Sequence, residues 1–194
     1  MKTVKVLMAT LLCFGLVACN SKPSEEDTYT ISMNGHTINV GAWTVEDLYA
    51  NGFSVGIVEG DTATAFTAEE MGAETIEART YYDDVELFYG DEDLGTVSLT
   101  NASTSDITFL EGTVTTFYTS NNYAGFDTIV INGVQIDPTD IDGTCTSIGG
   151  TTNAAGSCSL TQTAAGKNNV LTLSPDIIAD DGSISSVMLV IEKE

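Results

Sequence analysis

The feature that most constrains the fold of this 194-residue chain is an Asn-Gly dipeptide placed between two short alternating runs. Ile31 and Met33 alternate with polar residues before Asn34-Gly35, and Ile38 and Val40 alternate in the same way after it. Both central positions of a two-residue hairpin turn need positive φ, which asparagine and glycine tolerate. The pattern therefore predicts a β-hairpin with one buried face.

A similar pattern returns later in the chain. Residues 30–38 (TISMNGHTI) align with residues 128–136 (TIVINGVQI), and the apolar positions match. One interpretation is that the chain contains two related halves, 28–126 and 127–194. The alternative is that turn chemistry alone makes two Asn-Gly hairpins look alike.

The rest of the chain favours an α+β fold, mostly antiparallel sheet with two short helices. Residues 184–191 are apolar on both faces toward their end, which indicates a central strand. Frequent glycine and rare proline suit turns between many short strands. Further alternating runs, each expected to be a strand, lie at Val97/Leu99, Val114/Thr116/Tyr118, Ile129/Ile131 and Leu171/Leu173.

Both helices are predicted from their capping signals. Thr44 and Asp47 have the spacing of a capping box, and Gly52 suits a C-terminal cap. Thr139 and Asp142 repeat that spacing at the start of a helix over 139–148, which Gly149-Gly150 ends. On this second helix Ile141, Cys145 and Ile148 fall on one face, which is expected to be buried.

Residues 1–18 are expected to be a lipoprotein signal peptide. Lys2 and Lys5 precede an apolar run over 6–18, shorter than the roughly 20 residues of a membrane-spanning helix. The run ends in Leu16-Val17-Ala18-Cys19, which matches a bacterial lipobox and makes Cys19 the predicted lipidation site. We expect a tether over 19–27 and a single β-rich extracytoplasmic domain over 28–194. An ordinary signal peptide with a chance cysteine is the alternative.

The net negative charge of the chain limits the kinds of partner that it can bind. The chain has 28 acidic and 6 basic side chains, a formal charge of −22, which excludes a nucleic-acid binder because phosphate contacts need a basic face. Processing would remove Lys2 and Lys5 but no acidic residue, which leaves −24. Anionic lipid headgroups repel such a surface, so membrane attachment is expected through covalent lipid on Cys19 alone.

The two remaining cysteines of the expected domain, Cys145 and Cys158, are predicted to form a disulfide. An even pair in an exported protein is typical of a structural bridge. A metal site or a catalytic thiol are the alternatives. Two sulfurs without nearby histidine make a poor zinc site, and His36, the only histidine, is the only candidate base for a nucleophilic cysteine.

Acidic clusters raise the question of calcium, the one cofactor considered. None of the clusters has EF-hand spacing, and acidic residues are frequent enough for clusters to arise as solvated turns. Calcium therefore stays an alternative, and we expect no cofactor. The candidate ligands are Asp83, Asp84, Glu86, Asp91, Glu92 and Asp93, then Asp137, Asp140 and Asp142, then Asp176, Asp180 and Asp181.

Aromatic side chains are the candidate binding residues. Adjacent residues on a strand point to opposite faces, so one of Tyr81/Tyr82 and one of Phe117/Tyr118 is expected to face solvent or a groove. Tyrosines in such positions suit sugar or protein contact, although half-buried edge positions are the simpler explanation. The candidates are Trp43, Tyr81, Tyr82, Tyr118 and Tyr123.

In layout the chain resembles small bacterial surface lipoproteins of the gut Firmicutes type. The resemblance lies in the lipobox, the Asn-Gly hairpin leading to the residues 44–48 (TVEDL), the strand over 97–101 and the closing segment over 181–184. It implies an extracytoplasmic α+β domain and no catalytic residues, whereas the cysteine pair departs from it. We therefore expect a non-catalytic binding or structural module for a protein or glycan ligand. The alternatives are a calcium-stabilised adhesion or glycan-binding module and, third, a carboxylate-dependent hydrolase.

Overall fold

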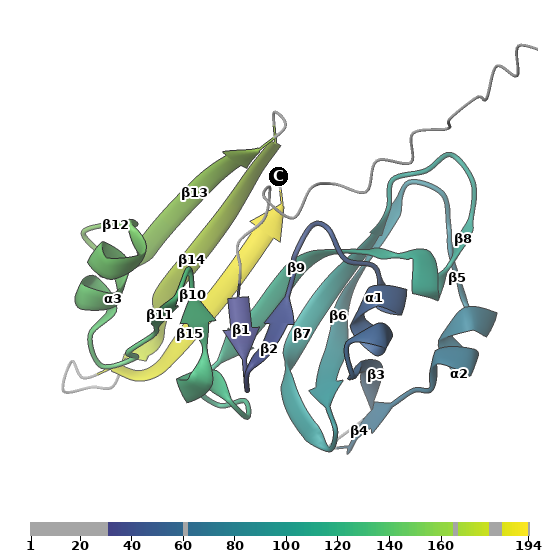
Figure 1. Ribbon diagram of the computed structural model, residues 1–194, viewed down its shortest axis with the longest axis horizontal. Helices are drawn as coiled ribbons and strands as arrows, with labels where there is room; N and C mark the ends of the chain where they lie inside the picture. The colour runs from purple at the N-terminus through teal and green to yellow at the C-terminus, as the bar shows by residue number, and fades with distance from the viewer. Residues whose placement is uncertain (1–30, 60–61, 165–166, 179–183, 194) are drawn as a thin grey trace, which may run out of the picture.

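The computed structural model describes residues 31–59, 62–164, 167–178 and 184–193. It is the expected α+β fold, dominated by antiparallel sheet (Figure 1). A four-stranded sheet has the order β11-β10-β1-β2 and consists of β1 (Ile31–Met33), β2 (His36–Ile38), β10 (Val130–Ile131) and β11 (Val134–Gln135). The signal peptide, Cys19, the tether and Asp180 and Asp181 lie outside the described residues.

A nine-stranded sheet forms the body of the molecule, in the order β12-β13-β14-β15-β9-β7-β6-β3-β4. Its strands are β3 (Phe53–Glu59), β4 (Thr62–Ala65), β6 (Thr80–Tyr89), β7 (Glu92–Asn101), β9 (Thr113–Ser120), β12 (Thr151–Thr152), β13 (Cys158–Ala164), β14 (Lys167–Ile178) and β15 (Ile184–Lys193). A short pair, β5 (Thr75–Ile76) with β8 (Ile107–Thr108), lies beside it. As predicted, the strand over 184–191 is central, between β14 and β9.

The described residues form three α-helices, one more than predicted: α1 (Val45–Ala50), α2 (Ala68–Ala73) and α3 (Ile141–Ile148). The capping box of Thr44 and Asp47 forms as expected. The helix that the sequence analysis missed, α2, begins with the same device, because Thr67 and Glu70 make a second capping box. Two 3-10 helices complete the list, η2 (Phe109–Glu111) and η3 (Phe126–Thr128).

The cap predicted for the last helix was one residue out of place. Asp140, not Thr139, is the N-cap of α3, and its side chain accepts a hydrogen bond from the Gly143 amide. Thr139 instead donates through its hydroxyl to Asp137. The face of Ile141, Cys145 and Ile148 is buried, as predicted.

Both Asn-Gly turns form, and the two hairpins pair with each other. Asn34 and Asn132 have φ of 53° and 51° and are followed by glycines that also have positive φ. Strand β1 runs antiparallel to β10, and Ser32 lies opposite Val130, the position that aligns with it in the sequence. A two-fold axis through that pair therefore relates the two hairpins.

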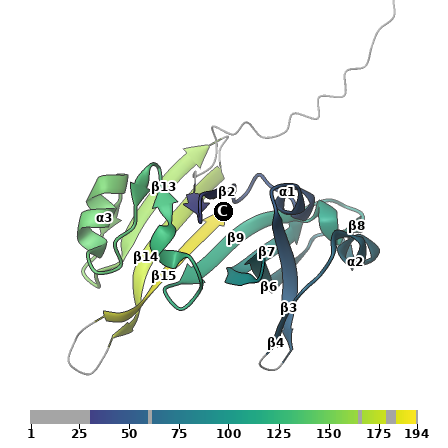
Figure 2. The same cartoon turned by 60° about the horizontal axis from the view of Figure 1, so that its bottom comes forward.

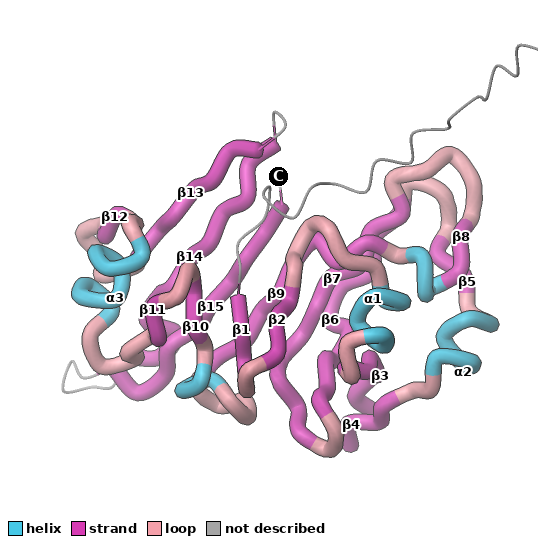
Figure 3. The backbone as a smooth tube through the Cα atoms, in the orientation of Figure 1, coloured by secondary structure: helices cyan, strands magenta, loops and turns pink. Residues whose placement is uncertain are grey.

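The strand order of the large sheet is also symmetric about its centre. Strands β9 and β15 pair at its centre, with Tyr118 opposite Val190. Outward from them, β7, β6 and β3 on one side match β14, β13 and β12 on the other, with β4 added at one edge (Figure 3). Each side thus has a hairpin, a helix, an outer strand (β3 or β12) and a three-stranded meander. This topology supports the two-halves interpretation, which stays a prediction.

Helices and the small sheet lie on one side of the large sheet (Figures 1 and 2). The core between these layers contains Ile31, Met33 and Ile131 from the small sheet together with Leu99 and Phe117 from the large one. All five are fully buried. The opposite side of the large sheet is the one that presents polar side chains on β7 and β9.

One predicted alternation of buried and exposed residues, over residues 114–118, was wrong. Val114 was predicted to share a face with Thr116 and Tyr118, but it is fully buried in the core. A bulge between Ser98 and Leu99 in the pairing of β7 with β9 shifts the phase of β9 by one residue. Thr116 and Tyr118 therefore face away from the core.

Candidate functional site

The candidate site lies on the uncovered face of strands β6, β7 and β9. On β7, Val97 and Leu99 point into the core, whereas Thr96, Ser98 and Thr100 are half-buried on the other face. This alternation is what a strand buried on one side should show. The face is therefore rich in hydroxyl groups over the middle of the sheet.

A groove of about 570 Å³ runs over this face. Its carboxylates come from β6 and its aromatic rings from β9 and the turn that follows β9. The lining residues are Asp83, Asp84, Glu86, Thr96, Ser98, Thr116, Tyr118 and Tyr123. A second hollow of about 500 Å³, which includes Arg79, Tyr81 and Asn101, adjoins it and shares Asp83, Ser98 and Thr116.

Glu86 is the most unusual residue of the groove. It lies opposite Thr96, which in turn lies opposite Tyr118, so the three residues form one row across three strands. The side chain is only 8% exposed, and among the described residues its Oε2 has no hydrogen-bond partner. Burial first, and then the nearby Asp93 and Asp84, raise the pKa of Glu86 to about 7. The carboxyl group of Glu86 therefore changes between its protonated and ionised forms near neutral pH.

Two tyrosines stand beside this carboxyl group. The rings of Tyr118 and Tyr123 are nearly perpendicular, at 88°, with centroids 6.3 Å apart. Backbone hydrogen bonds fix the turn that carries Tyr123, because the Tyr123 amide donates to Ser120 and the Ala124 amide donates to Asp93. Burial, followed by the charges of Glu86 and Asp93, raises the pKa of Tyr123.

The other predicted aromatic residues lie elsewhere. Tyr81 and Tyr82 are both exposed, at 67% and 42%, whereas only one was expected to be. Tyr81 lines the adjoining hollow, and Tyr82 packs edge-to-face on Phe109. Trp43 is half-buried against the hydrophobic core and lines neither hollow.

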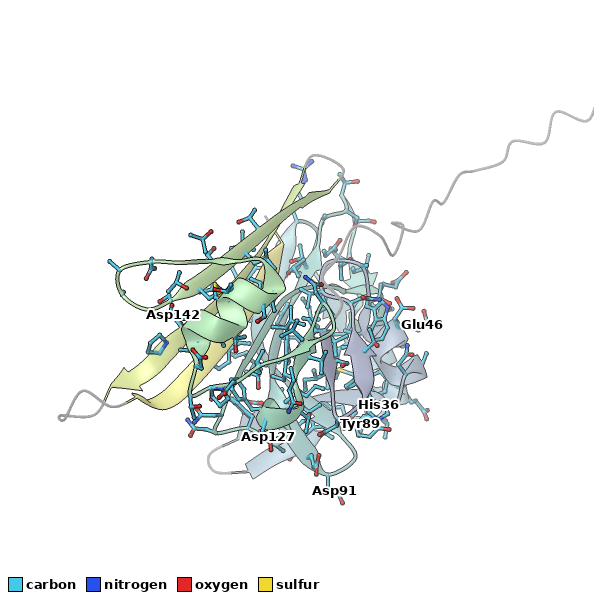
Figure 4. The ribbon with its side chains drawn as sticks, turned by 60° about the vertical axis from the view of Figure 1, so that its left-hand side comes forward. His36, Glu46, Tyr89, Asp91, Asp127 and Asp142 are labelled. Carbon is cyan, nitrogen blue, oxygen red and sulfur yellow. A yellow bond between two sulfur atoms is a disulfide. The ribbon has the colours of Figure 1, made fainter. Side chains whose placement is uncertain are left out.

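The acidic clusters separate into groove residues and local hydrogen-bond acceptors. Asp93 accepts from the Gly95 amide, Asp137 from the Thr139 amide and Asp140 from the Gly143 amide. Asp91 and Asp142 are exposed (Figure 4). In the described part of the chain, no three side chains of His, Cys, Asp or Glu come close enough together to hold a metal ion. The side chain of Asp176 is outside what the structure describes.

The predicted disulfide between Cys145 and Cys158 is present, and it joins α3 to β13. Gly150 lies directly over it, because a Cβ there would come within 2.8 Å of both sulfur atoms. The pair therefore offers no free thiol for metal binding or catalysis.

His36 has a packing role. Its ring stacks on Tyr89 with centroids 3.8 Å apart and meets Phe53 edge-on (Figure 4). The neighbouring Asn34 side chain donates to Glu92. These contacts dock the first hairpin onto the end of β6 and β7, away from the groove.

Sequence reasoning placed Glu86 in an acidic stretch but did not single it out. The available signal was its position between Val85 and Leu87, two apolar residues that face the core. A carboxylate in that phase must point to the opposite face of the strand. Its burial was not visible, because the rings that line the groove beside it come from residues 118 and 123.

Among the described residues, none of the helices has the length and apolar character that a membrane-spanning segment needs. No protein-family model matches the chain, and neither a curated protein nor a solved structure was found to be similar to it.

Proposed function

We propose that the protein is a membrane-anchored extracytoplasmic lipoprotein whose folded domain is a non-catalytic binding module. The anchor is covalent lipid on Cys19 of the lipobox, and the ligand-binding surface is the groove over β6, β7 and β9. One observation carries the binding role. A groove of small-molecule size combines two tyrosine rings, a row of hydroxyl groups and a buried carboxyl group whose Oε2 has no partner among the described residues.

The anchor is tested by metabolic labelling with a radioactive fatty acid in a bacterial host. The wild-type chain should be labelled and stay with the membrane, whereas Cys19→Ala should lose the label and be released or misprocessed. Membrane retention of Cys19→Ala without label would contradict the proposal, because the strongly acidic domain offers no second means of attachment.

The binding role is tested with arrays of glycans, peptides and small metabolites, probed with the purified full chain. Ligands of the groove should be lost in Tyr123→Ala and retained in Tyr82→Ala, a matched change of a tyrosine outside the groove. Ligands that bind both variants equally well would place the binding surface elsewhere.

A carboxylate-dependent hydrolase is the second candidate, and the pKa of Glu86 favours it. A general acid or base works best when its pKa lies near the working pH. The same arrays decide between the two functions. Cleavage of a bound glycan or peptide that Glu86→Gln abolishes, while binding persists, would make the protein an enzyme.

A further inference from the structure

The described lining residues of the groove carry negative charge without a matching positive charge. Asp83, Asp84 and Glu86 line it, and none of its described lining residues is basic. Arg79 lines only the adjoining hollow. Burying a carboxylate away from water is costly unless a donor or a counter-charge compensates it. The groove is therefore complementary to a cation.

Glu86 shows where the positive group would bind. Its side chain is more than nine-tenths buried, it lines the groove, and its Oε2 accepts no hydrogen bond from any described residue. A charged donor that reached this oxygen would form a charge-assisted hydrogen bond, which is stronger than a bond between neutral groups. Because Oε2 is almost fully buried, the Glu86 side chain must turn toward the groove before an ammonium group can bond to this atom.

The two tyrosines of the groove favour an organic cation over a metal ion. Two nearly perpendicular rings, Tyr118 and Tyr123, line the groove beside Glu86. The face of an aromatic ring attracts an organic ammonium group through its quadrupole. Calcium, in contrast, takes six to eight oxygen ligands, and no metal-binding group of side chains exists among the described residues. A neutral sugar would bring no positive charge to the carboxylates of the groove.

We infer that the groove binds a small aliphatic amine, with its ammonium group against Glu86 and its carbon chain along Tyr118 and Tyr123. A free amine fits better than a protein surface, because the groove has the volume of a small-molecule site. Asp83 and Asp84 lie along the same groove and would meet a second ammonium group. The inference rests on the proposed binding function and names its ligand class.

Calorimetric titration of the purified full chain with spermidine tests this inference. The ionic strength should be physiological, so that loose attraction to the acidic surface is screened. Glu86→Gln should weaken binding by about tenfold or more, the loss expected for a hydrogen bond to a charged group. Glu46→Gln is the matched control: it removes the same charge from α1, outside the groove, and should bind spermidine as the wild type does (Figure 4).

A second readout is the proton that Glu86 releases. An ammonium group stabilises the ionised carboxylate, so spermidine binding at pH 7 should release a proton to buffer from the wild type but not from Glu86→Gln. The other titratable groups facing Glu86 are Asp84 on β6, Asp93 on β7, Tyr118 on β9 and Tyr123 on the turn that follows. On β3, the residue opposite Glu86 is Gly56, which has no side chain and therefore no titratable group.

Three outcomes would overturn the inference. Equal weakening in Glu86→Gln and Glu46→Gln would mean that spermidine binds the acidic surface at large. Tighter binding of a trilysine peptide than of spermidine would make the ligand a basic peptide. No binding of spermidine, while an array ligand still depends on Tyr123, would refute the amine and leave the proposed function intact. If Glu86→Gln does not fold, Tyr123→Ala with Tyr82→Ala as its control gives the same test.

Discussion

The two sides of the large sheet share a topology but differ at the position that matters most. One row of paired residues crosses the sheet, and Glu86 and Ser159 lie at equivalent distances from its centre between Tyr118 and Val190. Glu86 is buried, whereas Ser159 is exposed. The same position in the sheet therefore carries a buried carboxyl group on one side and an exposed hydroxyl group on the other.

The two sides also differ in how they are stabilised. The β12–β15 side has a disulfide between its helix and its sheet. The β3–β9 side has no disulfide among its described residues and relies on insertions instead: α2 and β5 lie between β4 and β6, and β8 and η2 between β7 and β9. Both sides contribute buried residues to one core, and only the β12–β15 side adds a covalent bond among the described residues.

The largest expected effect comes from removing that bond. The double variant Cys145→Ala/Cys158→Ala should lower the free energy of unfolding by roughly 3 kcal/mol, because the bridge restricts the unfolded chain. The melting temperature should fall by about 6–12 °C for a domain of this size. Hydrogen exchange should show that the amides of α3 and β13 lose protection before those of β6 and β7. Unchanged melting of the double variant relative to the oxidised wild type would contradict this prediction.

A glycine breaks the symmetry next to Thr96, and its replacement should cost less than the disulfide. Gly95 has a φ of +129°, and a Cβ there would overlap the carbonyl oxygen of Tyr118. The equivalent residue beside Thr172 is the buried Leu171. Gly95→Ala should destabilise the fold by about 2 kcal/mol, since it combines a strained φ with a steric overlap. Leu171→Ala should also destabilise, but by leaving a cavity, which added small apolar molecules could fill. If Gly95→Ala melts at the same temperature as the wild type, the backbone of β7 can move enough to accommodate a side chain at position 95.

Glu86→Gln should stabilise the fold, and only at high pH. The unfolded side chain ionises near its ordinary value of 4.5, whereas the folded one holds its proton to about 7. Between these values the unfolded state binds fewer protons, so the contribution of Glu86 to the free energy of unfolding falls as pH rises. With allowance for solvent screening, the variant should gain on the order of 1–2 kcal/mol at pH 8 and nothing at pH 4.

Denaturant titrations at both pH values measure this difference. Glu46→Gln serves as the control, because it removes the same charge from an exposed position on α1. A Glu86→Gln variant that is destabilised equally at pH 4 and pH 8 would mean that Glu86 stabilises the fold in both of its charge states, which would contradict this prediction.

Local features of the chain were predictable because their causes lie within a few residues. The Asn34-Gly35 turn, the capping box at Thr44 and the buried face around Cys145 all follow from short spacings, and all three are confirmed. The helix after Thr67 was missed although it carries the same capping signal. The sequence therefore does contain a local signal for this helix.

Features that depend on distant partners were not predictable. The bulge that turns Val114 into the core arises only when β9 pairs with β7. The burial of Glu86 arises only when β6 pairs with β7 and the turn with Tyr123 meets Asp93. An acidic stretch in the sequence therefore could not show which of its carboxylates is buried.

The next smaller effect concerns the cap of α3. Asp140 accepts one hydrogen bond from the Gly143 amide, so Asp140→Ala should cost about 1 kcal/mol. Asp140→Asn should cost little, since asparagine caps as well as aspartate does. Thermal melting distinguishes the two. Equal loss in both variants would mean that the charge of Asp140 matters, which a cap does not require.

The smallest expected effect is the response to calcium, and it compares the two acidic groups directly. On the β12–β15 side the exposed Asp137 already accepts hydrogen bonds from Thr139, which lower its pKa. On the β3–β9 side Asp83 and Asp84 line a groove, and neither region gathers three metal-binding side chains among the described residues.

With a formal charge of −22, the acidic side chains of the folded protein repel one another, so any salt should raise the melting temperature. Millimolar calcium should therefore do no more than sodium chloride at the same ionic strength. A true site would add a stabilisation that grows as RT ln(1 + [L]/Kd). If calcium stabilises the protein beyond matched salt, and Asp83→Asn abolishes this extra stabilisation while Asp137→Asn does not, the groove binds a metal ion instead of an amine. That result would favour the calcium-stabilised adhesion module.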